Sequence, residues 1–148
     1  MNSLEDIAIQ VVDKHEAGQV TANVMAILYE ITDLMHALLE KDQADSIDLR
    51  SLPLLPGEYE ALKLILGEGE VSVRLETFGL TEIVETGLTG VWWVSHDDEN
   101  GERLAEFIEV TRIPEIIKSD RSEIQAACSA LQQQLNELAD EQVVTNAQ

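Results

Sequence analysis

The chain has 148 residues, of which 45% are apolar, and its nine basic and 29 acidic residues give a formal net charge of −20. A chain of this length suits a single domain with one core, which we expect to extend over residues 1–148. The charge disfavours nucleic acid as a partner, because phosphate binding depends on clustered Lys and Arg. No apolar run reaches the roughly 18 to 20 residues that a membrane span requires.

The N-terminus and the cysteine content indicate a cytoplasmic protein. The first residues, MNSLEDIAIQVVDKHE, carry acids where a secretory signal would carry basic residues. Cys128 is the only cysteine, so the chain has neither a disulfide framework nor a set of thiolate ligands. We therefore expect no resident metal or cofactor.

Two helices are predicted before residue 41. In the first and weaker pattern, apolar residues recur between Leu4 and Val12, and the helix ends near Gly18. In the second, apolar residues recur at steps of three and four from Val20 to about Glu40, and Thr21 is placed to cap the helix. The polar stretch KDQADS that follows predicts an exit loop.

Proline and glycine set the limits of a third, short helix within LPLLPGEYEALKLILG. Pro56 suits a first helical turn, so the helix is expected to begin near Gly57 or Glu58 and to end at Gly67. Its predicted buried stripe consists of Tyr59, Leu62, Ile65 and Leu66.

Four short β-prone segments follow. Val71, Val73 and Leu75 alternate with polar residues, and TEIVET, VWWVSH and RLAEFIEVT come next, separated by turn residues. The connections are too short for parallel crossovers, so the segments predict a four-stranded antiparallel meander. The DDENG sequence between the last two strands predicts a hairpin turn.

A closing helix is predicted over residues 120–140. Apolar residues alternate at steps of four and three along it: Ile124, Cys128, Leu131, Leu135 and Leu138. This spacing is typical of a coiled-coil seam, but two heptads are short, so pairing with a second copy, docking on the domain and fraying remain open. The complete pattern predicts an α+β fold of N-terminal helices, a four-stranded antiparallel sheet and a C-terminal helix.

The sequence lacks common catalytic motifs such as G-x-S-x-G, the P-loop and H-E-x-x-H, which argues against an enzyme. His96 is followed directly by Asp97, Asp98 and Glu99. Imidazole and carboxylate bind divalent ions, so a metal carrier or buffer that uses these residues is an alternative function.

The two tryptophans are adjacent in VWWV, so their side chains point to opposite faces of the sheet. If helices cover one face, one indole stands on the other, and we expect it to be Trp92, which shares its side with His96. An exposed indole beside acids suits a partner that carries apolar and basic residues. Glu106 shares its side with Leu104 and Ile108 and is the acid expected to be partly buried.

Motifs in a fixed order give a family resemblance. LPxxPGExxxL, GEGEV, ET-x(3)-GVWWV and AEFIEV-x-x-IP lie between residues 22 and 119. Together they resemble the C-terminal conserved domain of the hydrogenase expression/formation proteins of the HupH/HyaF type, which are accessory factors of uptake NiFe hydrogenases.

The resemblance implies a non-enzymatic maturation chaperone in the cytoplasm. Its implied partners are the iron–sulfur small subunit or its precursor and other hydrogenase maturation proteins, and a homodimer through the terminal helix is a further prediction. No catalytic residue carries over from the family. The strand pattern and the motifs place the partner-binding residues at Trp92, Trp93, His96 and Glu106 and in the turn at Pro56, Gly57, Glu58 and Tyr59.

Overall fold

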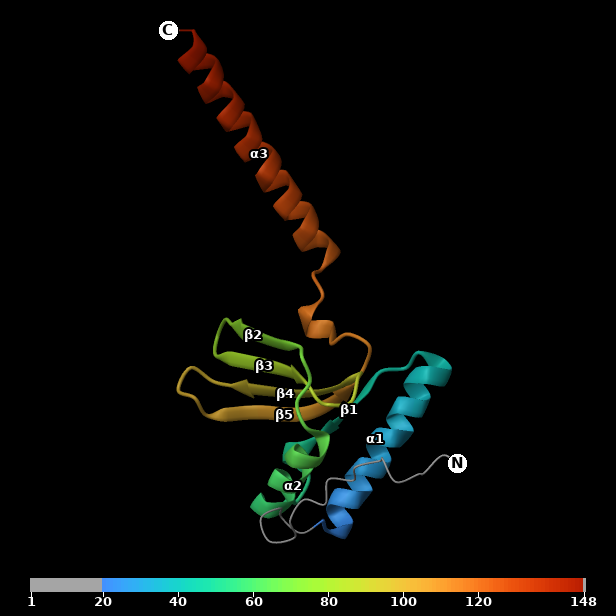
Figure 1. Cartoon of the computed structure of the whole chain (residues 1–148). Coiled ribbons are helices and arrows are strands. Elements are labelled where there is room, and N and C mark those ends of the chain that lie inside the picture. The colour runs from blue at the N-terminus through green and yellow to red at the C-terminus, as the bar shows by residue number, and fades with distance from the viewer. Residues whose placement is uncertain (1–19, 148) are drawn as a thin grey trace, which may run out of the picture. The chain divides into compact units, whose positions relative to one another are not determined.

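The computed structural model describes residues 20–147, and the chain divides at Pro114 into two compact units, 1–114 and 115–148. Figure 1 shows the helices and strands of both units. The first predicted helix, from Leu4 to near Gly18, lies outside the described residues. The assignment of residues 1–148 to one domain stays a prediction.

Helix α1 (Ala22–Lys41) confirms the strongest helical pattern of the sequence. Thr21 is its N-cap and accepts a hydrogen bond from the backbone N–H of Val24 at 3.4 Å. By length and composition alone α1 could cross a membrane, in contrast to the expectation that no run of the sequence is long and apolar enough. Its buried stripe, Val24, Ile27 and Ile31, packs in the core of the first unit.

Helix α2 (Pro56–Leu66) begins at Pro56, one residue before the predicted start. It ends, as predicted, at Gly67, whose φ of 66° is in the left-handed region that favours glycine. Leu62 and Leu66 are buried as expected. Ile65 is 45% exposed, so its place in the buried stripe was wrong.

The sheet has five antiparallel strands in the order β1-β5-β4-β3-β2. The four predicted segments form the expected meander and confirm the α+β class: β2 (Ser72–Glu76), β3 (Leu80–Glu85), β4 (Val91–Asp97) and β5 (Arg103–Val110). The additional strand, β1 (Asp45–Asp48), pairs with β5 and continues into a short 3-10 helix, η2 (Leu49–Ser51). The polar stretch KDQADS predicts a loop at Asp45, because DSID offers a single apolar residue, Ile47, as a strand signal.

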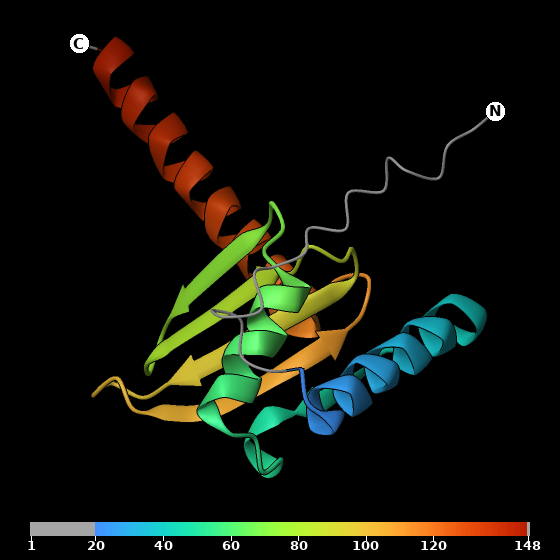
Figure 2. The same ribbon diagram turned by 60° about the horizontal axis from the view of Figure 1, so that its bottom comes forward.

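Both described helices of the first unit pack on the same face of this sheet (Figure 2). The core residues come from α1, α2, β1, η2, β4 and β5, and the adjacent strands β4 and β5 contribute Val91, Trp93, Ile108 and Val110. Trp92 and Val94 lie on the opposite face because β4 alternates.

The second unit contains the short 3-10 helix η3 (Glu115–Ile117) and the long helix α3 (Arg121–Asn146). Asp120 caps α3 by accepting a hydrogen bond from the N–H of Ser122 at 2.8 Å, and Glu123 completes the capping box. The predicted C-terminal helix is thus confirmed and extends past residue 140.

Candidate functional site

Both tryptophans are buried, on opposite faces of β4: Trp92 is 5% exposed and Trp93 is 8% exposed. The indole Nε1 of Trp92 donates to the carbonyl of Thr111 at 3.0 Å, and that of Trp93 donates to Glu106 Oε1 at 2.7 Å. Thr111 is held in place because its N–H bonds to the carbonyl of Gly90 at 2.9 Å. The prediction that Trp92 is exposed is therefore wrong, because each indole N–H has an acceptor within the chain.

Glu106 is the hub of a hydrogen-bond network on the helix-covered face. It is 6% exposed, which confirms the prediction that this acid is at least partly buried. Its Oε1 accepts from the hydroxyl of Tyr59, from the indole of Trp93 and from Arg103 Nη1 at 2.8 Å. Burial, together with the hydrogen bond to Glu106, raises the pKa of Tyr59, so this hydroxyl remains a donor at neutral pH. Arg103 also pairs with Asp97.

An aromatic pair beside this network holds a cation. The rings of Tyr59 and Trp93 meet edge to face, with 5.4 Å between centroids and an interplanar angle of 89°. Lys63 Nζ lies 4.9 Å from the centroid of Trp93 and 5.4 Å from that of Tyr59. The aromatic cluster therefore already accommodates a positive charge.

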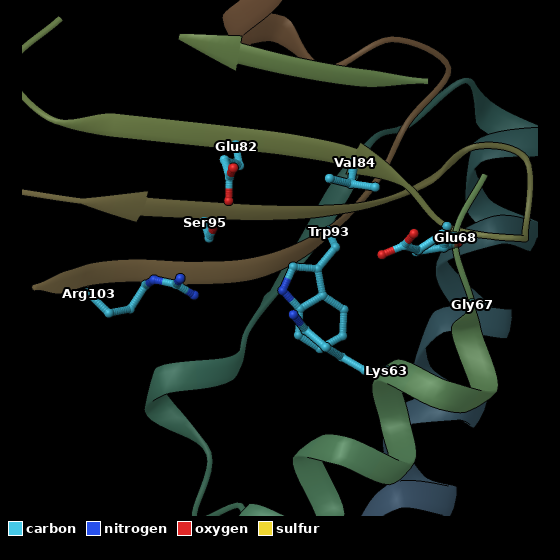
Figure 3. A pocket seen from close by; sticks show the side chains of 9 residues that line it. Lys63, Gly67, Glu68, Glu82, Val84, Trp93, Ser95 and Arg103 are labelled. Carbon is cyan, nitrogen blue, oxygen red and sulfur yellow. The ribbon is translucent and has the colours of Figure 1, made fainter. Parts of the chain in front are cut away.

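A pocket of about 150 Å³ opens against Trp93 on the same face (Figure 3). The strand register creates its floor, because Val84 lies opposite Trp93 and Glu82 lies opposite Ser95. The lining residues are Lys63, Gly67, Glu68, Glu82, Val84, Thr86, Trp93, Ser95 and Arg103. The pocket forms where α2 ends, beside its last turn.

The charges at this pocket are unevenly satisfied. Arg103 is countered by Asp97 and Glu106. Glu82 has one ion pair, at 3.9 Å to Arg74. Glu68 makes no hydrogen bond or ion pair with any described residue. Two carboxylates are thus available to a basic group that enters the pocket.

The family model for the HupH hydrogenase expression protein, C-terminal conserved region, matches residues 21–138. The chain belongs to this family. Its match begins at the N-cap of α1 and ends within α3, so it includes the pocket and most of the terminal helix. The resemblance stated from the sequence motifs is confirmed.

Named relatives and a solved structure agree with the HupH family. The chain is 30% identical over 105 residues to the hydrogenase expression/formation protein HoxQ of Azotobacter vinelandii, covering 70% of this chain and 36% of the relative. It is 30% identical over 95 residues to the hydrogenase-1 operon protein HyaF of Escherichia coli K12, covering 64% of this chain and 33% of the relative. The chain thus spans about a third of the curated relatives' length.

A solved structure of the hydrogenase expression protein HupH from Thiobacillus denitrificans ATCC 25259 has the same fold. Its sequence is 42% identical, the TM-score is 0.74, and the match covers 79% of this chain and 98% of that chain. The architecture described above is therefore that of the HupH family.

Glu58, one of the sequence-predicted site residues, connects the starts of α1 and α2. It is buried and accepts hydrogen bonds from Thr21 Oγ1 at 2.5 Å, the N–H of Leu55 at 3.0 Å and Asn23 Nδ2 at 3.3 Å. Its neighbours Pro56 and Gly57 are exposed. Glu58 therefore serves the HupH fold as a capping residue, whereas the turn before it remains accessible.

The hydrogen bond from Thr21, together with that from Leu55, lowers the pKa of Glu58. Because the folded pKa is below the unfolded value of about 4.3, the stabilisation by the carboxylate is present above that value and is lost as pH falls through the folded pKa. We expect Glu58→Gln to unfold at a lower urea concentration than the natural chain at neutral pH. The difference between the two urea midpoints should become smaller as the pH is lowered toward about pH 3. Glu60→Gln, at an exposed position of α2, is the control. A difference in urea midpoint that does not depend on pH would contradict the stabilising role of the Glu58 carboxylate.

His96 and the acids beside it are used within the sheet and the hairpin. His96 Nδ1 lies 2.7 Å from Thr81 Oγ1, across the neighbouring strand. Asp98 Oδ1 accepts from the N–H groups of Asn100 at 2.8 Å and Glu102 at 2.9 Å, which confirms the predicted turn. The described residues contain no group of three or more metal ligands, and no contact in this hairpin favours the metal-carrier alternative.

The structure brings together three predicted site residues, Tyr59, Trp93 and Glu106, and separates Trp92 and His96 from them on the other face. The charged residues of the pocket were not predicted from the sequence: Lys63, Glu68, Glu82 and Arg103. Strand alternation could have placed Glu82 on the Trp93 side. Lys63 and Glu68 gave no such signal, because their position depends on how α2 packs against the sheet.

Proposed function

We propose that this chain is a non-enzymatic accessory protein of the cytoplasm that acts in the maturation of an uptake NiFe hydrogenase. In this proposal it holds the iron–sulfur small subunit or its precursor and works with other maturation proteins. The match of the HupH family model to residues 21–138 carries the proposal. The names of the relatives, which refer to hydrogenase expression and formation, support it.

The partner-binding site in this proposal is the pocket against Trp93. A basic segment of the client enters it, and its cationic side chains meet Glu68 and Glu82, whose carboxylates are the least satisfied of the pocket. Lys63 lies over the rings of Tyr59 and Trp93, so these rings are compatible with a positive charge. This supports the binding of a basic segment at the pocket. The net charge of −20 attracts such a segment over a longer range.

The turn before α2, at the other end of that helix from the pocket, supplies a second, apolar contact in this proposal. Leu55 is 65% exposed, and Pro56 and Gly57 are also accessible. An exposed leucine in a proline-limited turn offers a fixed apolar contact at little entropic cost. The turn thus keeps the partner-binding role predicted for it. The partner-binding surface of the sheet is assigned to the face that carries Trp93, not to the face that carries Trp92 and His96.

Charge reversal at the pocket tests the site. We expect the double variant Glu68→Lys and Glu82→Lys to bind the hydrogenase small-subunit precursor about tenfold more weakly than the natural chain, because like charges then face the basic segment. Titration of labelled precursor at constant ionic strength measures the dissociation constants.

The double variant Glu99→Lys and Glu102→Lys is the matched control. It makes the same change in net charge on exposed residues of the hairpin after β4, outside the pocket lining. Equal weakening by both variants would assign the effect to overall charge and reject the pocket. Absence of binding by the natural chain would instead reject the client.

A further inference from the structure

Helix α3 carries an apolar seam that no other described residue of its own unit covers. Ile124, Leu131, Leu135 and Leu138 are between 51% and 57% exposed, and Cys128 between them is exposed as well. They recur at alternating steps of four and three, the spacing that keeps one side of a helix facing a partner helix. Figure 1 shows α3 as one uninterrupted helix, so the seam is continuous.

The residues around the seam carry no charge over most of its length. Residues 124–136 include no Asp, Glu, Lys or Arg, although the chain as a whole has a net charge of −20. The positions that flank the seam are occupied by glutamine and alanine: Gln125, Ala127, Gln132, Gln134 and Ala139. A solvated helix of so acidic a protein would be expected to carry charges here, as residues 137–141 do.

The uncharged residues beside the seam indicate which kind of partner binds it. A basic partner would find no carboxylate along residues 124–136, and an acidic partner would find no cation. A second copy of α3 offers the same apolar seam with the same neutral flanks, so two copies meet without repulsion between flanking side chains. A twofold pair makes such a surface self-complementary.

We propose that α3 pairs with α3 of a second copy along Ile124, Cys128, Leu131, Leu135 and Leu138, forming a short two-stranded coiled coil. The inference goes beyond the proposed maturation role, since it concerns self-association rather than the client. Because the seam is two heptads long, the dimer is weak, with a dissociation constant on the order of 10 μM. The pocket against Trp93 is not part of this contact.

Sedimentation of the full chain under reducing conditions, between about 5 and 500 μM, measures the dimer. Cys128 is the only cysteine and lies within the seam, so its reaction with a thiol reagent reports on the same contact. We expect the apparent mass to rise toward twice the monomer value as the concentration increases. The rate constant for Cys128 is expected to fall at least about fivefold over the same range.

Two double variants test whether the seam is responsible for dimerisation. Leu131→Glu with Leu135→Glu is expected to remain monomeric, and its Cys128 is expected to react at one rate at all concentrations. Ala126→Glu with Ser129→Glu adds the same charge on the opposite side of the helix and should dimerise as the natural chain does. A natural chain that stays monomeric at the highest concentration, or a seam variant that dimerises normally, would overturn the proposal.

Discussion

Glu106→Ala is expected to lower the free energy of unfolding by about 2 to 4 kcal/mol. The substitution removes the acceptor shared by Tyr59, Trp93 and Arg103 and leaves the buried indole N–H without a partner. Arg103 would retain Asp97, which limits the loss. Urea denaturation at neutral pH, followed by far-UV circular dichroism, measures the difference.

Two control substitutions distinguish the effect of losing the hydrogen-bond network from the effect of losing one carboxylate. Glu106→Gln keeps an oxygen acceptor and a similar shape, so its loss of stability should be clearly smaller than that of Glu106→Ala. Glu99→Ala removes an exposed carboxylate of the hairpin and should change stability by less than about 0.5 kcal/mol. If Glu106→Ala behaved like Glu99→Ala, Glu106 would not be the hub described above.

Trp92→Ala and Trp93→Ala are each expected to lower the free energy of unfolding by about 3 to 5 kcal/mol, the range for large aromatic residues removed from a core. Both rings are buried, and each indole N–H has an acceptor. Denaturation followed by circular dichroism is suitable, because the substitutions themselves alter fluorescence. A small loss for Trp92→Ala alone would favour the exposed position that the sequence pattern suggested.

Quenching of tryptophan fluorescence by iodide gives a second measurement on the natural chain. Because neither indole is accessible, we expect the quenching constant of the folded chain to be several-fold below that of the chain unfolded in urea. Trp92→Phe and Trp93→Phe replace the indole with a smaller aromatic ring and lose one hydrogen bond each, so they should cost about 1 to 2 kcal/mol less than the alanine variants. Strong quenching of the folded Trp93→Phe variant would show that Trp92 is accessible.

The burial of both tryptophans affects how partner binding is tested. An alanine variant of either residue would weaken the fold as well as any contact with a client, so lost binding would have two explanations. Lys63, Glu68 and the exposed turn at Leu55 lie at the surface. Substitutions there can change recognition while the core of the HupH domain stays intact.

Periodicity in the sequence was sufficient for most of the secondary structure. The steps of three and four in α1, and Pro56 with Gly67 at the ends of α2, predicted these helices to within about two residues. Alternation of apolar and polar residues predicted the first strand, and β-prone runs between turn residues predicted the other three. The pleat of a strand assigned Trp92 and Trp93 to opposite faces. It also predicted the burial of Glu106, because this residue shares its side with Ile108.

Tertiary structure decided what covers each face. Strand β1 has a weak local signal and exists because Ile47 lies opposite Ile108 in a neighbouring strand. The pocket depends on where α2 ends above the sheet, and the hydrogen bond between Tyr59 and Glu106 joins residues 47 positions apart. Alternation along a strand predicts on which face of the sheet a side chain lies. Whether that side meets water or protein depends on contacts between distant segments, which is why the exposure of Trp92 was predicted wrongly.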